Sequence, residues 1–352
     1  MAKPKTVSNP TAVTAGCDCH LDSFTMVTVD RVGQPVEAAR FGNDVSGWEQ
    51  AVAACRRWEV SVVGIEGASG YGRSLAQTLD RAGVGVLEVP TRLTARLRRI
   101  DGAGKTDPGD ATAIARAVLS GQGSVWRDDP DLETVRVVSH RREELVRTQT
   151  QEINRLRALL AEIDPGRVQT LGRLRSLTQL QALAKVRYGG DRHRQTVAVL
   201  IRRIAADARD RLCQIRGLEK TLTGLLPPLG WTLISQTQGM GVVTAAGLLA
   251  ELAGTDRFAT DAKMAAWAGI SPLDASSGRQ HRHRLNRGGN RQANRAVHTI
   301  ALTQLRHGGP AARYINQRTA QGKTQREALR AVKRHIIRHI WKIIRDNPPT
   351  QN

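Results

Sequence analysis

One heptapeptide organises this chain: Lys105-Thr106-Asp107-Pro108-Gly109-Asp110-Ala111. Pro108 suits the first turn of a helix, because the N–H that it lacks would have no partner there. Asp107 is then predicted as the N-cap of a helix that continues to residue 119, with Asp110 one turn along the same face. Carboxylates this close repel each other unless a cation joins them, and hard divalent cations bind carboxylate oxygens. The heptapeptide therefore indicates either an acidic helix start or part of a metal site.

Strand and helix patterns alternate upstream of the heptapeptide. One strand is predicted to begin near Val13, and further strands are predicted over residues 24–29, 60–65 and 84–89. A hairpin turn is predicted at 32–35, and helices over 48–58, 70–81 and 92–100. This alternation predicts an α/β layer fold with partly parallel strands. Ligand groups in such folds gather at the carboxyl ends of strands. Glu66 follows such a strand directly, and the helix of Asp107 and Asp110 is expected to pack beside it.

Strands disappear from the pattern between residues 131 and 226. Apolar residues recur there at helical spacing, with a break at Pro165-Gly166. The pattern predicts an antiparallel helical hairpin or coiled coil suited to dimerisation, and an ordinary helical bundle layer is the alternative.

A glycine-bracketed turn, Gly239-Met240-Gly241, opens the last third of the chain and leads into a predicted helix over residues 243–252. It looks like a helix-hairpin-helix element, whose glycines let backbone amides approach a phosphate; a plain tight turn is the alternative. Asn290 is predicted as the N-cap of a helix that runs to residue 305, and a basic helix is predicted over residues 323–345.

The charge balance indicates a polyanionic partner. The net charge is +21 over 352 residues, and residues 277–345 hold 17 Lys and Arg against one acidic residue, Glu327. So large an excess favours nucleic acid. A membrane-surface protein is disfavoured, because no run of about 18 apolar residues occurs. Residues 1–13 are expected to be a disordered tail without a secretory segment.

Cysteine and histidine spacing gives no sign of a zinc site. The four cysteines form no Cys-x-x-Cys pair, which argues against a zinc knuckle or a disulfide framework; they are Cys17, Cys19, Cys55 and Cys213. A cytoplasmic protein is expected on this basis. The pairs His281/His283 and His335/His339 lie among arginines and are interpreted as parts of a basic surface.

The order of these motifs resembles that of the DEDD transposases of bacterial insertion sequences, the "IS one-ten" family. The residues that carry the resemblance are Asp18, Ile65-Glu66-Gly67, the heptapeptide, Gly239-Met240-Gly241, Trp267-Ala268-Gly269-Ile270-Ser271-Pro272, Ser276-Ser277-Gly278 and Arg287-Gly288-Gly289-Asn290-Arg291. The resemblance implies an α/β plus all-α chain. A RuvC-like (ribonuclease-H-like) domain would span residues 14–128, a helical coiled-coil connector 129–228, and a mainly helical C-terminal transposase domain with a serine loop 229–346.

The resemblance also implies a catalytic apparatus. Asp18, Glu66, Asp107 and Asp110 would hold Mg²⁺, and Ser277 would be the nucleophile; Asp22 and Ser276 are the neighbouring alternatives. Relatives of this kind are guided by an RNA of their own element and act on DNA as homodimers that pair into tetramers. Nucleic-acid contacts are expected from Lys105, Gly239, Gly241, Arg279, Arg282, Arg284, Arg287 and Arg291, because guanidinium groups and helix-terminal amides bind phosphates.

The predicted function is a DNA transposase or recombinase. Carboxylates around a divalent metal suit phosphoryl transfer, and a serine hydroxyl needs activation to attack at neutral pH. We expect the metal centre to activate Ser277, which would store the energy of the broken phosphodiester as a phosphoserine–DNA bond. The alternatives are a metal-dependent Holliday-junction-type endonuclease that uses water, and a non-catalytic nucleic-acid-binding scaffold.

Overall fold

The computed structural model describes residues 13–100, 106–252, 258–271, 273–274, 283–284, 286 and 289–347. Of the predicted features, the N-terminal tail, Lys105 and the Ser276-Ser277 pair lie outside these residues. The chain divides into two units, which meet in sequence at Asp129 and Pro130.

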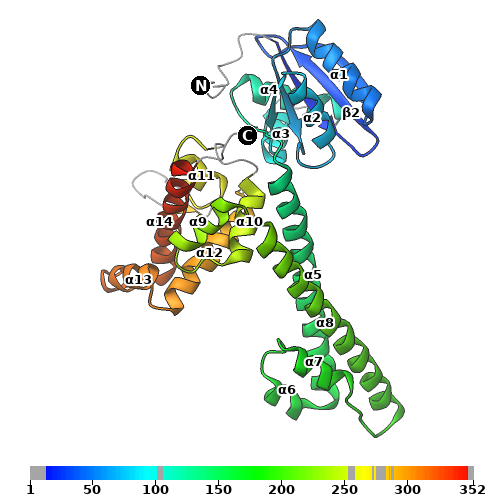
Figure 1. Cartoon of the computed structure of the whole chain (residues 1–352), viewed down its shortest axis with the longest axis vertical. Helices are drawn as coiled ribbons and strands as arrows, with labels where there is room; N and C mark the ends of the chain where they lie inside the picture. Colours follow the sequence, from blue (N-terminus) through cyan, green and yellow to red (C-terminus); the bar gives the residue numbers. More distant parts are fainter. Residues whose placement is uncertain are drawn as a thin grey trace. The chain divides into compact units, whose positions relative to one another are not determined.

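A six-stranded mixed sheet forms the centre of the first unit (Figure 1). Its strands are β1 (Thr14–Cys19), β2 (Ser23–Val29), β3 (Pro35–Gly42), β4 (Val62–Glu66), β5 (Gly85–Glu88) and β6 (Ser124–Val125), in the order β3-β2-β1-β4-β5-β6. Strands β1 to β3 form an antiparallel meander, β1, β4 and β5 are parallel, and β6 is antiparallel to β5. The prediction of partly parallel strands is confirmed, and the mixed sheet fits a ribonuclease-H-like domain.

Helices cover both faces of this sheet. They are α1 (Val45–Arg57), α2 (Arg73–Arg81), α3 (Thr91–Ile100) and α4 (Asp107–Leu119). Side chains of α1 and α2 share a core with Ala15, Cys17, Val63 and Ile65, whereas α4 packs against the opposite side of the same strands. Successive residues of a strand point to opposite faces, so the even-numbered residues of β1 and β4 face α4.

The predicted start of α4 is wrong by one residue. The N-cap is Thr106, whose extended backbone ends the loop and whose hydroxyl accepts a hydrogen bond from the Gly109 N–H at 3.2 Å. Capping requires an oxygen acceptor three residues before the N–H that it satisfies. The Thr106 side chain meets this need, so Asp107 is the first helical residue and both carboxylates lie inside the first turn.

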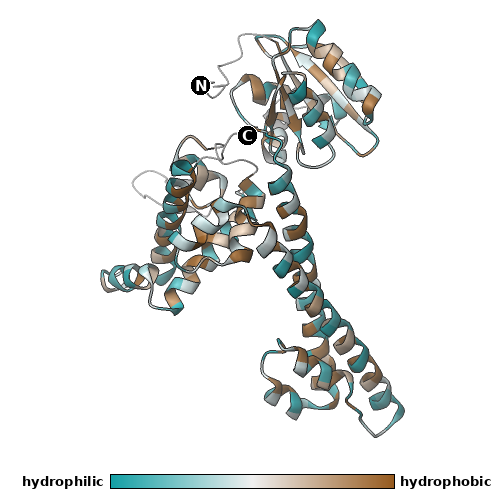
Figure 2. Ribbon diagram, in the orientation of Figure 1, coloured by the Kyte–Doolittle hydropathy of each residue, from teal (hydrophilic) through white to brown (hydrophobic). Residues whose placement is uncertain are grey.

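The second unit is mainly helical among its described residues. Two 34-residue helices, α5 (Pro130–Ile163) and α8 (Arg192–Leu225), pack as an antiparallel hairpin whose far end is closed by α6 (Pro165–Leu171) and α7 (Leu177–Ala184) (Figure 1). Hydrophilic and hydrophobic residues alternate along both long helices (Figure 2). The hairpin was predicted from this spacing; dimerisation through it stays a prediction.

The remaining helices form a second, larger core. They are α9 (Pro228–Gln236), α10 (Val242–Leu252), α11 (Asp261–Trp267), α12 (Arg291–Arg306), α13 (Pro310–Ala320) and α14 (Gln325–Asp346), with a short ribbon of β7 (Leu273–Asp274) and β8 (His283–Arg284). Asn290 caps α12 as predicted: its Oδ1 accepts from the Ala293 N–H at 2.9 Å. Among the described residues, no helix combines the length and the apolar character needed to span a bilayer.

Candidate metal centre and nucleic-acid interface

The parallel register of the sheet brings two of the predicted acids together. Asp18 of β1 and Glu66 of β4 are paired residues at the carboxyl ends of adjacent parallel strands. Both have even numbers and therefore lie on the face that α4 covers. The edge where ligand groups were expected thus presents two carboxylates toward the start of α4.

Glycines in the two strands let α4 approach this face closely. A Cβ at Gly16 would lie 2.2 Å from the Ala111 carbonyl oxygen and 2.4 Å from the Ala115 nitrogen, and a Cβ at Gly64 would lie 2.5 Å from a methyl group of Val118. Only hydrogen fits at such distances. The missing side chains allow the backbone of α4 to rest on the sheet, which sets its first turn, with Asp107 and Asp110, beside Asp18.

Three side chains form a compact group of potential metal ligands. His20 Nε2 lies 3.3 Å from Asp18 Oδ2 and 3.7 Å from Asp107 Oδ1. One ligand atom from each of the three lies within 4.8 Å of the others. The Asp18 carboxylate is 14% exposed and that of Asp107 is 45% exposed, so the group is open on the side of α4.

Electrostatics show that the other two acids belong to the same cluster. Burial raises the pKa of Asp18; His20 lowers it, and the nearby charges of Asp110, Glu66 and Asp107 raise it further. Asp110 is itself buried, with 8% of its surface exposed. Like charges gathered in a partly buried site are unfavourable unless a cation compensates them.

The donor set fits a hard divalent cation. Carboxylate oxygens are the ligands that Mg²⁺ and Mn²⁺ prefer. The adjacent thiol is no competitor, because Cys19 has an odd number on β1 and faces the other side of the sheet, where its Sγ would lie 3.2 Å from a Cβ at Gly72. Asp18, Glu66, Asp107 and Asp110 are therefore the groups that would hold the metal.

The structure shows where the alternative Asp22 lies and adds one residue to the group. Asp22 lies in the exposed bend between β1 and β2, outside the group formed by Asp18, His20 and Asp107. His20 was missed by the sequence analysis. Its signal was its spacing: it follows Asp18 by two residues, so both side chains emerge on the same face where β1 ends.

The predicted basic residues of the second unit are only partly described. The side chains of Arg279, Arg282, Arg284 and Arg287 lie outside the described residues, although the backbone of Arg284 pairs with Leu273 in the β7–β8 ribbon. Arg291 is exposed in the first turn of α12. Its role in binding nucleic acid stays a prediction.

The glycine turn has a structural reason at one of its two positions. Gly239 has a φ of +85°, which favours glycine, and a Cβ there would lie 3.1 Å from the Ile300 carbonyl oxygen. A Cβ at Gly241 would meet nothing within 4 Å, and this residue immediately precedes α10. The open helix start is compatible with the predicted phosphate contact.

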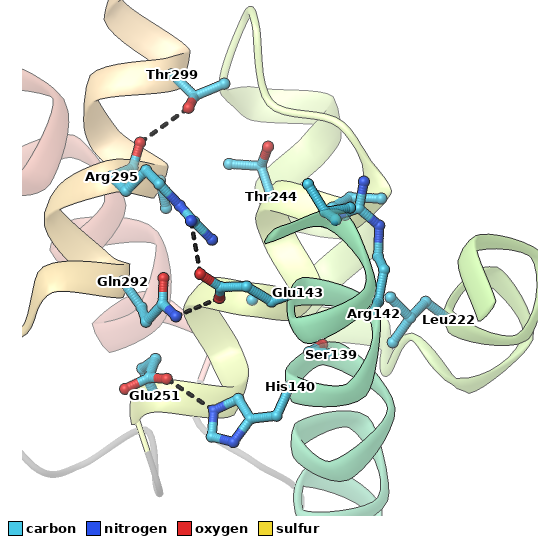
Figure 3. A pocket seen from close by; sticks show the side chains of 14 residues that line it. Ser139, His140, Arg142, Glu143, Leu222, Thr244, Glu251, Gln292, Arg295 and Thr299 are labelled. Carbon is cyan, nitrogen blue, oxygen red and sulfur yellow. Dashed lines mark hydrogen bonds and ion pairs between the residues drawn. The ribbon is translucent and has the colours of Figure 1, made fainter. Parts of the chain in front are cut away.

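A polar pocket of about 260 Å³ lies in the second unit, between α5, α8, α10 and α12 (Figure 3). Glu143 of α5 accepts hydrogen bonds from Gln292 and from Arg295, the latter at 2.6 Å. Burial opposes the ionised form of Glu143, but these bonds and that of Arg147 prevail, so its pKa is lowered. The carboxylate is thus satisfied by its own neighbours and fixes α12 to α5.

A second carboxylate in this pocket anchors the start of α12. Glu251 of α10 is bound by His140 at 3.0 Å (Figure 3). It also accepts a hydrogen bond from the side-chain amide of Asn290 at 2.5 Å. Burial would raise the pKa of Glu251, but these two hydrogen bonds outweigh it and hold the pKa below its usual value. Since Asn290 also caps α12, the Glu251 contact fixes the start of that helix.

Known protein families match both units. A DEDD transposase domain model, that of IS110, matches residues 15–165, and a model described as "Transposase IS116/IS110/IS902 family" matches residues 232–317. Two segments of the chain thus match DEDD transposase domains of the IS110/IS116 family, which supports an enzyme that acts on DNA.

Relatives from insertion elements align with the chain. An IS116 protein of Streptomyces clavuligerus is 25% identical over 94% of each chain, and an IS900 protein of Mycobacterium paratuberculosis is 26% identical over 95% of this chain and 96% of its own. An IS110 protein of Streptomyces coelicolor is 38% identical over 137 residues, which cover 38% of this chain and 33% of that relative.

Among solved structures, RuvC of Thermus thermophilus is similar to about a third of the chain. In complex with a Holliday junction substrate it shares 14% sequence identity with a TM-score of 0.27, covering 32% of this chain and 99% of RuvC.

Proposed function

We propose that this chain cuts and rejoins DNA strands with a carboxylate-bound divalent metal and a serine nucleophile. The observation that carries the proposal is the convergence of Asp18, His20 and Asp107, with Glu66 and Asp110 in electrostatic reach. Four clustered acids beside a buried strand edge are costly without a cation.

The metal supplies Lewis-acid chemistry: it withdraws charge from phosphoryl oxygens and lowers the pKa of a bound hydroxyl. In the proposed reaction the Ser277 oxygen attacks the scissile phosphorus and loses its proton. The bond between phosphorus and the leaving 3′-oxygen breaks, and that oxygen takes up a proton as a free 3′-hydroxyl. A 3′-hydroxyl of a second strand then attacks the phosphoserine bond, restores a phosphodiester and releases Ser277.

The proposed partners follow from the resemblance to the DEDD transposases and from the net positive charge of the chain. DNA donor and target, an RNA guide of the element and a homodimer that pairs into a tetramer are proposed as the working assembly. The excess of 17 basic residues over one acidic residue between residues 277 and 345 supports phosphate-rich partners.

The test is to trap protein–DNA covalent adducts in cleavage reactions with Mg²⁺ and the element's own RNA. Ser277→Ala should abolish the adduct and retain DNA binding, whereas Ser276→Ala should retain the adduct. Asp107→Asn should abolish both cleavage and adduct. If the wild-type protein cleaves DNA without forming any adduct, the metal-dependent endonuclease is favoured. If the wild-type protein does not cleave DNA and Asp107→Asn leaves DNA binding unchanged, the non-catalytic scaffold is favoured.

A further inference from the structure

The second unit contains a cavity that the proposed function does not use. It has a volume of about 470 Å³ and lies between the end of α9, the start of α13 and the middle of α14. Its floor is apolar, formed by Ala311, Val332 and Ile336, all buried. Its size is in the range of small-molecule sites, roughly 300–1,000 Å³.

One polar group in the wall lacks a partner. Thr237 is 2% exposed, and its hydroxyl has no hydrogen bond among the described residues. A buried polar atom without a partner is uncommon and calls for an explanation. A ligand with hydrogen-bonding atoms along its edge would supply the missing partner.

The polar atoms around Thr237 are already engaged, which fixes the walls. The Gln304 side chain donates to the Gln238 carbonyl oxygen at 2.7 Å and accepts from the Ala311 N–H at 3.2 Å. His339 Nε2 lies 2.8 Å from the Gln236 carbonyl oxygen. Gln236 and Gln238 also line the cavity and are exposed, so their side-chain amides are available to a ligand edge.

An aromatic wall completes the cavity. Tyr314 lies edge-on to His335, with ring centroids 5.1 Å apart. Arg318 donates to the Tyr314 hydroxyl at 3.1 Å, and its guanidinium carbon is 5.3 Å from the ring centroid. Both rings are therefore held in place before any ligand arrives, which reduces the entropic cost of binding.

The histidines of this wall are not placed as a metal pair. His339 is bonded to a backbone carbonyl and His335 is in contact with Tyr314. Burial and the charges of Arg338, Arg318 and Arg334 lower the pKa of His335. A neutral imidazole offers a flat ring and a hydrogen-bonding edge.

The surroundings of the cavity are cationic. Arg318 is bonded to uncharged partners, the Tyr314 hydroxyl and Gln321. Helix α13 contains Arg313 and Arg318 and no acidic residue. A ligand whose flat part enters the cavity and whose remainder carries phosphates would match both features.

We propose that this cavity binds a single unstacked nucleobase of a nucleic-acid strand, with Tyr314 and His335 as the ring contacts and Thr237 with the two glutamines at the base edge. The strand's phosphates lie toward Arg313 and Arg318. Proteins bind single-stranded bases in this way, by aromatic contact together with hydrogen bonds to the base edge. The choice of ligand rests on the proposed function, which makes nucleic acid the partner.

The experiment compares two single-stranded oligonucleotides of equal length, one with bases and one in which every base is replaced by an abasic site. Both carry the same phosphates, so at fixed salt the difference in affinity reports base contacts alone. With the full-length protein the base-bearing strand should bind more tightly. Tyr314→Ala should reduce that preference by roughly 5- to 150-fold, the range expected for one stacked base.

Matched variants separate the pocket from general effects. Tyr314→Phe keeps the ring and should keep the preference. Thr237→Val keeps the shape without the hydroxyl and should weaken base-bearing strands only. Should Tyr314→Ala unfold, His335→Ala provides the same comparison, because that side chain is exposed.

The wild-type protein gives a direct result that needs no variant. A 2-aminopurine flanked by abasic sites has no stacked neighbours in the free strand, so it should lose fluorescence on binding, because contact with an aromatic ring quenches it. Equal affinity for the two strands, or a preference that survives in folded Tyr314→Ala, would overturn the proposal. If no protein–DNA adduct forms but the base preference is present, the serine mechanism is rejected and the pocket proposal is retained. If the adduct forms but the base preference is absent, only the pocket proposal is rejected.

Discussion

Gly16 is the residue on which the placement of the acidic cluster depends most directly. Backbone atoms of α4 occupy the space that a side chain at this position would need. The nearest is the Ala111 carbonyl oxygen, 2.2 Å from where a Cβ would be. A backbone contact cannot rotate away as the end of a side chain can. The only relief is for α4 to move off the sheet, which would carry Asp107 and Asp110 away from Asp18.

Gly16→Ala is therefore expected to destabilise the first unit by about 1–3 kcal/mol or more, the cost of overpacking, and to abolish Mg²⁺ binding. The measurement is thermal or urea unfolding with and without Mg²⁺. Gly217→Ala is the matched control: it lies within α8, where an added Cβ meets nothing within 4 Å. It should stabilise the protein by about 0.5–1 kcal/mol. Equal stability of Gly16→Ala and wild type would contradict the close approach of α4.

Asp18→Asn should separate charge repulsion from metal binding. Without metal, the variant should be at least as stable as wild type, because it removes one of several like charges that raise the pKa of Asp18. With Mg²⁺ at about 100 times its Kd, wild type should gain about 2.7 kcal/mol and the variant should gain much less. Calorimetry measures both effects. Asp22→Asn, in the exposed bend, should behave as wild type. If this variant lost the stabilisation by Mg²⁺, Asp22 would belong to the metal site.

At this scale, residue type was predictable and exact geometry was not. Asp18, Glu66, Asp107 and Asp110 were chosen from motif order, and the structure brings them into one neighbourhood. The N-cap of α4 was predicted at Asp107, one residue after the true cap, Thr106. The Asp107 carboxylate and the Thr106 hydroxyl are both good caps, and only the backbone conformation decides between them. His20 was missed because its proximity to Asp107 arises from packing between elements distant in sequence.

At the scale of elements, the first unit followed its periodicity. The parallel strands β4 and β5 were visible as short apolar runs between turn residues, and helices α1 and α2 from their spacing. Strand β3 was not predicted, since its burial alternates weakly and it lies at the edge of the sheet. Residues 124–125 form too short a strand for any pattern to show.

In the second unit, buried carboxylates decide how α10 and α12 pack on α5. Glu143→Gln should lower the free energy of unfolding at neutral pH by about 1–3 kcal/mol, because Arg295 and Gln292 lose a charged acceptor. Glu144→Gln is the control: its side chain is 60% exposed, it pairs with Arg141, and the change should cost about 0.5 kcal/mol or less. Urea unfolding followed by circular dichroism gives both values. Similar losses in the two variants would show that the Glu143 contacts do not stabilise the packing.

Acid should weaken the same packing. The pKa values of Glu143 and Glu251 are both lowered in the folded state. Folding therefore gains stability above the unfolded-state pKa of 4.5, and this gain is lost as the pH falls through the lower folded-state pKa values. We expect the free energy of unfolding of the second unit to decrease on acidification below about pH 4.5. The decrease should be smaller in Glu143→Gln, and an identical pH profile in that variant would contradict the assignment.

At the scale of the whole molecule, composition predicts a nucleic-acid partner, and the change in hydrophobic pattern predicts where the strand-containing part of the chain ends. The net charge of +21 is a property of the whole sequence, and helical spacing replaces alternating strands from residue 131, next to the unit boundary at Pro130. The cavity around Thr237 could not be foreseen. Its walls come from α9, α13 and α14, and periodicity within one helix does not show which helices leave space between them.

Self-association is the whole-molecule property that the hairpin makes testable. Helix α8 buries Val197, Ile201 and Ala205 within its own unit, yet Val199 is 50% exposed and Leu200 46% exposed. Large apolar side chains side by side on an exposed helix are the contacts that an antiparallel hairpin would offer to a second copy of the chain. The double change Val199→Lys and Leu200→Lys should therefore weaken dimerisation at least about tenfold, since burying each side chain contributes roughly 1.5–3 kcal/mol.

Sedimentation equilibrium over a concentration series measures that dimer constant. Val32→Lys is the control, because this residue is 79% exposed in the β2–β3 turn of the other unit and its backbone N–H, which bonds to Asp30, is unchanged. It should dimerise as wild type does. If the α8 variant dimerises normally while its unfolding curve is also unchanged, the hairpin does not use these residues for assembly. If the proposed homodimer is the active form, recombination should fall with dimerisation in the α8 variant, whereas Mg²⁺ binding by the Asp18 cluster should be unaffected.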